Sequence, residues 1–67
     1  MSVADLVLRD ALTDAEWRLS AAPHGSQPAI WVIDLYPPSG PVRGLRLDRQ
    51  DLRALAAFVA RLADGGQ

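Results

Sequence analysis

Cysteine is absent from this 67-residue chain, so disulfides and thiolate-bound metals cannot stabilise it. His24 is the single histidine and cannot form a metal site by itself. A chain this short buries only about 60% of its unfolded surface, and domains of this size usually need a disulfide, a metal or a partner chain. We therefore expect one domain over residues 1–67, without metal or cofactor, that folds with the help of a partner chain.

Lysine and asparagine are also absent, and all seven basic residues are arginine. With a net charge of −1, no overall field attracts nucleic acid or an anionic membrane. No apolar run approaches the roughly 20 residues of a membrane span. Residues 1–5 have neither the basic nor the apolar region of a signal peptide. These absences predict a cytoplasmic protein without a membrane partner.

The clearest element is an amphipathic helix from Asp48 to Ala63. Asp48 suits the N-cap, and Asp51 has a position from which it can reach back as in a capping box. Apolar residues then recur at helical spacing and form one stripe, made of Leu52, Leu55, Ala56, Val59, Leu62 and Ala63. Gly65 and Gly66 follow as a helix stop. Every local signal therefore predicts a C-terminal helix packed on the rest of the domain.

Three segments upstream of this helix are predicted strands. Residues 30–36 are rich in β-branched and aromatic side chains and are bounded by prolines. A proline- and glycine-rich turn at 37–41 leads to a second strand at 42–47. Residues 17–21 alternate between apolar and polar, and the loop 23–28 joins them to residue 30. The predicted fold class is α+β: an antiparallel meander of three or four strands followed by one helix.

The first sixteen residues are compatible with two structures. Ser2 with Asp5, and Thr13 with Glu16, have the spacing of capping boxes, which favours short helices. The apolar run at 6–8 followed by a turn favours a strand, which would complete a four-stranded meander. We take the strand as the expectation, and the helical alternative stays open.

Catalytic chemistry has few residues to build on. His24 lies in a loop of proline, glycine and serine, without a recognisable nucleophile and orienting group. The carboxylates at the start of the helix are explained by capping. Asp34 is an acid within an apolar strand, where pairing with a cross-strand arginine such as Arg18 or Arg43 is expected. The sequence therefore predicts a protein that is not an enzyme.

The strand at 30–36 is apolar on both sides. Residues 30 and 32 point to one face, and residues 31, 33 and 35 point to the other. One helix covers only one face, so the second must be covered by the N-terminal segment or by another molecule. This predicts an interaction or regulatory module, with a homodimer as the simplest form. The expected interaction residues are Trp31, Ile33, Leu35 and Phe58.

Single-stranded nucleic-acid binding is the alternative function. Aromatic side chains on an open sheet can stack on bases, and neighbouring arginines can contact phosphates. The candidate contacts are Trp17, Arg18, Arg43 and Arg46. Strand alternation puts Arg46 opposite Leu45 and Leu47, and puts Arg43 on the leucine face unless a bulge at Gly44 shifts the register. The location of the tryptophans, covered or beside arginines, separates the two functions.

Part of the chain also resembles a known family. From Gly44 the sequence Gly-Leu-Arg-Leu-Asp-Arg-Gln-Asp-Leu-Arg-Ala-Leu has the spacing of a stretch in the single-strand-DNA-binding transcriptional coactivators, the positive-cofactor-four family. Ile33-Asp34-Leu35-Tyr36 resembles a strand that precedes it there. The similarity covers residues 30–62 and implies a four-stranded meander followed by a dimerising helix. Leu52 stands where that family has an aromatic residue, and its lysine-rich binding face has no counterpart here.

Overall fold

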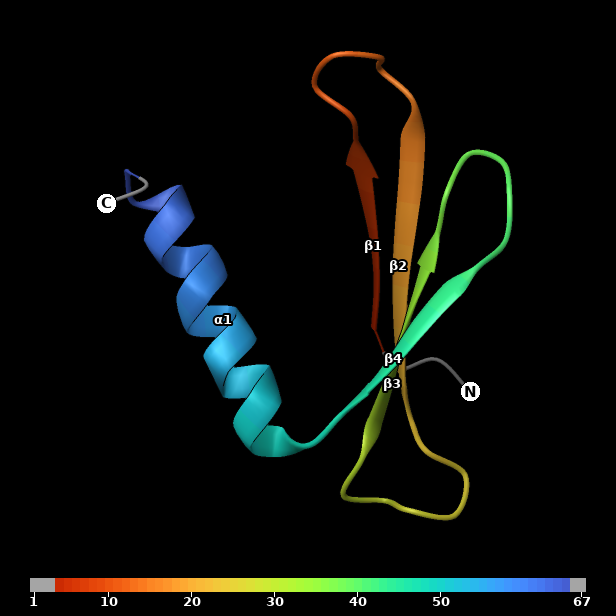
Figure 1. The fold of residues 1–67 in the computed structure, drawn as a ribbon, viewed down its shortest axis with the longest axis vertical. Helices are drawn as coiled ribbons and strands as arrows, with labels where there is room; N and C mark the ends of the chain where they lie inside the picture. Colours follow the sequence, from red (N-terminus) through yellow and green to blue (C-terminus); the bar gives the residue numbers. More distant parts are fainter. Residues whose placement is uncertain (1–3, 66–67) are drawn as a thin grey trace.

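The structure, a computed structural model, describes residues 4–65 and consists of a four-stranded antiparallel sheet followed by one helix (Figure 1). The elements are β1 (Ala4–Arg9), β2 (Glu16–Pro23), β3 (Trp31–Tyr36), β4 (Arg43–Leu47) and α1 (Arg49–Ala63). The strands pair in sequence order, which leaves β1 and β4 at the edges. The predicted α+β meander is confirmed, in its four-stranded form.

The N-terminal segment is a strand, so its helical alternative is wrong. β1 pairs with β2 from Ala4 opposite Ala21 to Arg9 opposite Glu16. Thr13 caps no helix: its hydroxyl accepts a hydrogen bond from the Ala15 amide at 3.3 Å within a turn. A strand here gains a full ladder of backbone hydrogen bonds, whereas a single helical turn would have no surface to pack on. The suggested cap at Ser2 lies outside the described residues.

The turn between β1 and β2 is organised by Asp10. Its Oδ1 accepts hydrogen bonds from the amides of Leu12 at 2.8 Å and Thr13 at 3.0 Å. Its backbone carbonyl accepts from the amide of Asp14, which has a left-handed φ of 62°. These amide donors stabilise the carboxylate and hold the pKa of Asp10 below its usual range.

The helix begins where the sequence predicts. Asp48 is the N-cap, and its Oδ1 accepts a hydrogen bond from the Asp51 amide at 2.8 Å. At the other end, the Asp64 amide donates to the carbonyl of Ala60, and Gly65 has a positive φ of 124°. Gly65 therefore supplies the predicted stop, while Gly66 lies outside the described residues.

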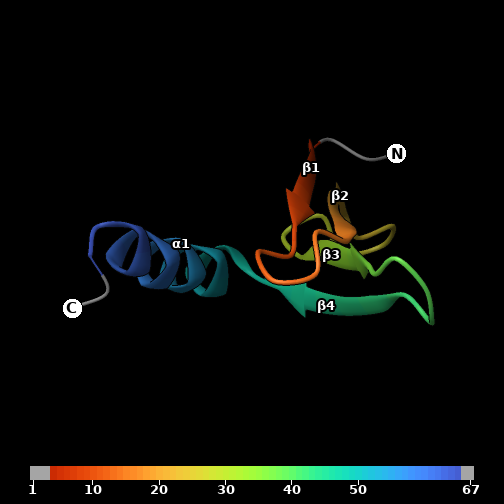
Figure 2. The same ribbon diagram turned by 90° about the horizontal axis from the view of Figure 1, so that it is seen from above.

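The position of α1 differs from the prediction that it packs on the sheet. α1 starts at the end of β4 and runs off to one side of the sheet instead of lying over it (Figures 1 and 2). Between Leu47, the last residue of β4, and Arg49, the first of α1, stands only the N-cap Asp48. This connection is shorter than the roughly two to six residues that commonly join a strand to a helix, and α1 approaches its own sheet only at the corner near Leu55. As a result, no residue in 4–65 is buried.

The Asp10 turn predicts a specific acid response. Because the folded pKa of Asp10 is depressed, its contribution to stability is present above the unfolded pKa and is lost as the pH falls through the folded pKa. A carbon-detected NMR titration should give the Asp10 carboxyl a pKa below its usual value. Asp10→Asn keeps an oxygen that can accept hydrogen bonds from the Leu12 and Thr13 amides, but it cannot titrate. The loss of stability at low pH that comes from Asp10 should therefore disappear in this variant. An unshifted Asp10 midpoint would contradict the turn geometry.

The helix cap predicts a measurable loss of stability. Asp48→Ala leaves the Asp51 amide without its acceptor and should lower the free energy of unfolding by about 1 kcal/mol. Urea unfolding at a fixed protein concentration measures the change. Asp48→Ser keeps a capping oxygen and should restore most of the loss. Equal stability of wild type and Asp48→Ala would show that the helix begins at another residue.

Candidate functional site

Pairing along the four strands places nearly all of the large apolar strand side chains on one face of the sheet. Residues directly opposite each other share a face, and successive residues alternate between faces. We call this surface the apolar face, and its apolar members are Ala4, Leu6, Leu8, Trp17, Leu19, Ala21, Pro23, Trp31, Ile33, Leu35, Leu45 and Leu47. All of them are half-buried or exposed. Exposed apolar surfaces of this extent are uncommon on monomeric domains and often mark interaction sites.

The apolar stripe of α1 borders the same face. Leu55 lines a hollow of about 220 Å³ together with Leu6 of β1, Leu19 and Ala21 of β2 and Ile33 of β3. Farther along the helix, Val59 and Leu62 are about half exposed. Two apolar walls therefore face a common space, and the chain's own side chains leave it unfilled.

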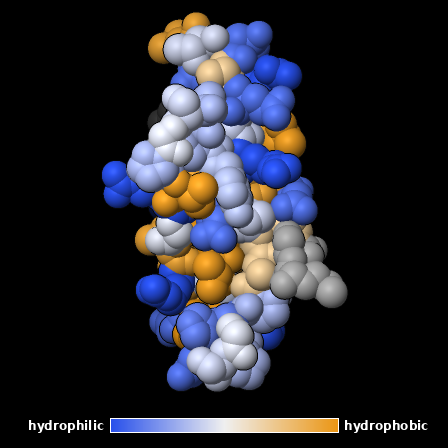
Figure 3. Space-filling model, turned by 90° about the vertical axis from the view of Figure 1, so that its right-hand side faces the viewer, coloured by the Kyte–Doolittle hydropathy of each residue, from blue (hydrophilic) through white to orange (hydrophobic). Residues whose placement is uncertain are grey.

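The opposite surface, which we call the polar face, corrects the prediction that β3 needs cover on both sides. Its members are Asp5, Val7, Arg9, Glu16, Arg18, Ser20, Ala22, Val32, Asp34, Tyr36, Gly44 and Arg46. In space-filling view from the side away from α1, hydrophilic and neutral residues predominate, with separate hydrophobic patches (Figure 3). Val32 is apolar, but it lies between a small residue and a charged one: Ala22 on β2 and Arg46 on β4 are its cross-strand neighbours. The large apolar side chains of the strands are therefore concentrated on the apolar face.

The charged residues of the polar face are balanced in number, and two of its arginines have a close partner on the same face. Arg9 and Glu16 form an exposed ion pair at 3.4 Å. The Arg18 guanidinium lies 5.7 Å from the ring centre of its cross-strand neighbour Tyr36, a cation–π arrangement. Three arginines (Arg9, Arg18 and Arg46) and three acids (Asp5, Glu16 and Asp34) occupy the strands on this face, so its net charge is zero.

Asp34 lies beside a glycine, and the expected pairing with Arg43 is wrong. Asp34 stands opposite Gly44, and its Oδ1 comes within 2.7 Å of where a Cβ on that glycine would be. Arg43 is opposite Leu35 and therefore on the other face. Arg18 shares the face of Asp34 but has its guanidinium over the Tyr36 ring. The absence of a side chain at Gly44 leaves the space that the carboxylate uses.

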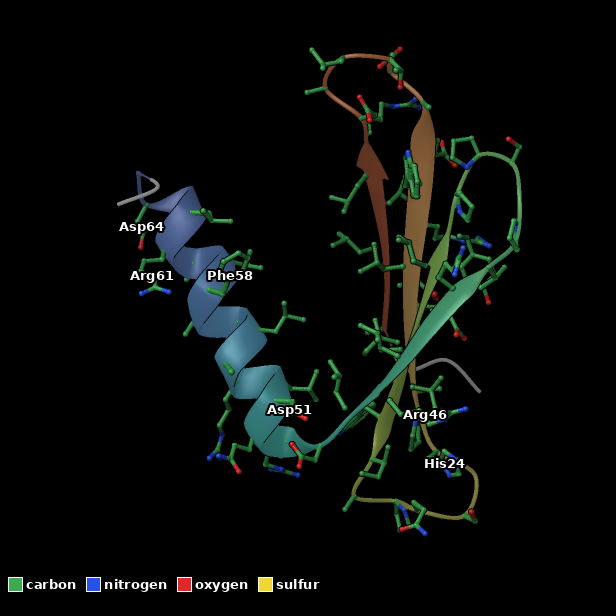
Figure 4. The ribbon with its side chains drawn as sticks, viewed as in Figure 1. His24, Arg46, Asp51, Phe58, Arg61 and Asp64 are labelled. Atoms are coloured by element: carbon green, nitrogen blue, oxygen red, sulfur yellow. The ribbon has the colours of Figure 1, made fainter. Side chains whose placement is uncertain are left out.

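The four expected interaction residues lie on the two apolar walls. Trp31, Ile33 and Leu35 share the apolar face with each other and with Trp17. Phe58 lies on α1 and is about half exposed, whereas Arg61 and Asp64 project from the side of the helix away from the sheet (Figure 4). The surface joins these residues, with the sheet and the helix each supplying one wall.

The four candidate nucleic-acid contacts are divided between the two faces. Arg18 and Arg46 are on the polar face, and Arg46 projects away from α1 (Figure 4). Trp17 and Arg43 are on the apolar face. The register of β3 and β4 is continuous through Gly44, so no bulge brings Arg43 to the other side. Both tryptophans are therefore separated from Arg18 and Arg46 by the sheet.

Sequence reasoning missed the contribution of β1 to the apolar face. Leu6 and Leu8 are two residues apart, so in a strand they point to the same face and Val7 points to the other. The continuous apolar run Leu6-Val7-Leu8 concealed this alternation, because the sequence alone does not say which of the three residues faces which side. Leu45 was placed with Leu47 on the leucine face of its strand but was not among the expected interaction residues.

The remaining polar groups form no catalytic arrangement in the part of the chain that is described. His24 Nδ1 accepts a hydrogen bond from the Ser26 amide at 3.2 Å within the β2–β3 loop. Among residues 4–65, no group of three histidine, aspartate or glutamate side chains is placed to hold a metal ion. The single described helix, α1, is neither long nor apolar enough to cross a membrane.

No family model, curated protein or solved structure matches the chain. The function must therefore be argued from the site itself.

Proposed function

We propose that this chain is a non-enzymatic interaction module of regulatory or accessory type, whose working unit is a homodimer held together through the apolar face and the stripe of α1. The observation that carries the proposal is that no residue between 4 and 65 is buried, although half of the sequence is hydrophobic. A chain that adopts this fold needs apolar contacts that it does not make with itself.

The accessible surface supports a partner of considerable size. The chain exposes 5549 Å², whereas a folded monomer of its mass exposes about 4,100 Å². The excess of about 1,400 Å² is larger than the roughly 800 Å² that each partner buries in a standard interface. It falls in the range of obligate homodimers, whose interfaces are the most apolar.

The overall dimensions support the same conclusion. The radius of gyration is 13.3 Å, compared with about 11 Å for a compact domain of this length. The molecule measures 38 × 32 × 17 Å, because α1 extends away from the sheet. A second chain would restore both compactness and a core. The non-enzymatic part of the proposal is supported by Asp10, His24 and Asp48, whose side chains accept hydrogen bonds from backbone amides in turns or at the helix cap.

The homodimer proposal predicts different results for two neighbouring substitutions. Leu6 on the apolar face and Val7 on the polar face are 54% and 53% exposed and lie on the same edge strand. Leu6→Asp puts a charge into the proposed interface and should abolish the dimer, whereas Val7→Asp lies beside Arg18 and should leave it intact. Light scattering should give wild type and Val7→Asp a mass near twice 7.2 kDa.

The melting temperature provides the second measurement. If folding and dimerisation are coupled, the Tm of wild type should rise with protein concentration, and Leu6→Asp should lose most of its far-ultraviolet circular dichroism. A wild-type chain that is a folded monomer at high concentration would contradict the proposal. So would equal effects of the two substitutions on the measured mass.

Single-stranded nucleic-acid binding is a second candidate. It is favoured by the resemblance to the coactivator family and by Arg18, Arg46 and Tyr36 on one exposed face. Its weakness is electrostatic, because the acids on that face cancel its arginines and leave no charge to neutralise phosphates.

The nucleic-acid candidate predicts weak or absent binding. A fluorescent single-stranded oligonucleotide titrated with the protein at low salt should show no anisotropy change at micromolar protein. Salt-sensitive binding that is lost in Arg46→Glu and retained in Arg53→Glu, a substitution on α1, would promote this function above the interaction module.

A further inference from the structure

We propose that the two chains exchange their helices, so that α1 of each chain lies on the apolar face of the other. This inference rests on the proposed homodimer and names the segment that covers the exposed surface. The occupant of the hollow between sheet and helix is then the α1 helix of a second copy.

The connection between β4 and α1 favours exchange. Asp48 is the only residue between strand and helix, and its side chain is fixed by the hydrogen bond with the Asp51 amide. The backbone at Asp48 is extended, with φ of −85° and ψ of 178°, so α1 continues outward from the edge strand. A short, fixed hinge that prevents an element from folding back on its own chain favours exchange of that element between copies.

The dimensions of the apolar face match a second helix. Four strands spaced about 4.8 Å apart give a sheet about 19 Å wide, whereas a helix with its side chains is about 10 Å wide. The 15 residues of α1 span about 22 Å, which matches the length of the six- to eight-residue strands. The sheet therefore has room for a helix beyond the corner that Leu55 approaches.

The chemistry of α1 matches the proposed position. Its stripe of leucine, valine and alanine is exposed in the single chain, although one end of it already borders the sheet. Its other side carries Arg49, Arg53 and Asp64, which stay in water when the stripe lies on a partner. In a twofold arrangement the exchange is reciprocal, so each apolar face and each stripe is covered by the same contact.

Photo-crosslinking of the full chain tests the exchange. Val59, on the stripe, is replaced by the photoreactive residue p-benzoylphenylalanine in unlabelled protein, which is refolded together with an equal amount of 15N-labelled wild type. Because every basic residue is arginine, trypsin cuts after Arg9, Arg18 and Arg43. The fragment 1–9 then contains β1, and the fragment 19–43 contains most of β2 and all of β3.

The expected product joins the unlabelled (light) helix fragment 54–61 to a 15N-labelled (heavy) strand fragment, either 1–9 or 19–43. Light and heavy strand fragments should appear in comparable amounts, because each photoreactive chain meets either kind of partner. Ala57 lies on the other side of α1 and provides the matched control. The same photoreactive residue at position 57 should give at least a tenfold lower yield of these products.

Each other outcome overturns the inference in a distinguishable way. Exclusively light strand fragments in a species of dimeric mass mean that α1 covers its own sheet, which overturns the exchange and leaves the homodimer standing. Heavy helix fragments in place of strand fragments mean that the helices pair with each other, which also overturns it. A monomeric mass for wild type overturns both the exchange and the proposed homodimer.

Discussion

A sheet whose apolar face is wider than one helix is the constraint on which the rest of this structure depends. Strand alternation gathers leucine, isoleucine and tryptophan from all four strands on one surface, while the charged strand residues other than Arg43 lie on the other. Residues 4–65 contain a single helix, and the sequence has no cysteine to form a disulfide in place of a core. In the proposed homodimer, the hydrophobic contacts that stabilise this sheet come largely from the second chain.

Asp48 links local structure to assembly. Its carboxylate caps α1, and its extended backbone is the only connection between β4 and the helix. A longer loop would allow α1 to lie across its own strands and would give the monomer a small core. The short connection keeps the stripe of α1 exposed, and in the proposed dimer this exposure becomes the interface. A property of one turn thus determines how much of the chain is available to a partner.

The polar face has a different physical character. Its arginines and acids cancel in number, Arg9 pairs with Glu16, and Arg18 lies over Tyr36. Such a surface is well solvated and has no strong field, which suits the outside of an assembly better than a phosphate-binding face. The separation of Trp17 and Trp31 from Arg18 and Arg46 argues in the same direction. Base stacking on the two tryptophans and phosphate contact by Arg18 and Arg46 would have to occur on opposite sides of one sheet.

Much of the local structure was predictable because it depends on neighbours in the sequence. The cap at Asp48, the stripe spacing of α1 and the order of three strands follow from hydrogen bonding and periodicity within short segments. The first sixteen residues were ambiguous, since Thr13 with Glu16 resembles a cap and Leu6-Val7-Leu8 shows no clear alternation. Pairing with β2 resolved both points, because a strand is stabilised by the ladder that another segment provides.

The sequence by itself determined the elements, their order and the amphipathic character of α1, because these follow from the spacing of side chains along the chain. Strand alternation already predicted that Arg43 and Arg46 point to opposite faces, and the structure added that no bulge at Gly44 changes this. The tertiary structure alone decided which residues of different strands share a face, and that β1 contributes Leu6 and Leu8 to the apolar face. It also decided that α1 leaves its own sheet uncovered. These properties depend on the register between strands and on the backbone conformation of Asp48, which sets where α1 leaves β4. Neither can be read from composition or from the periodicity of side chains.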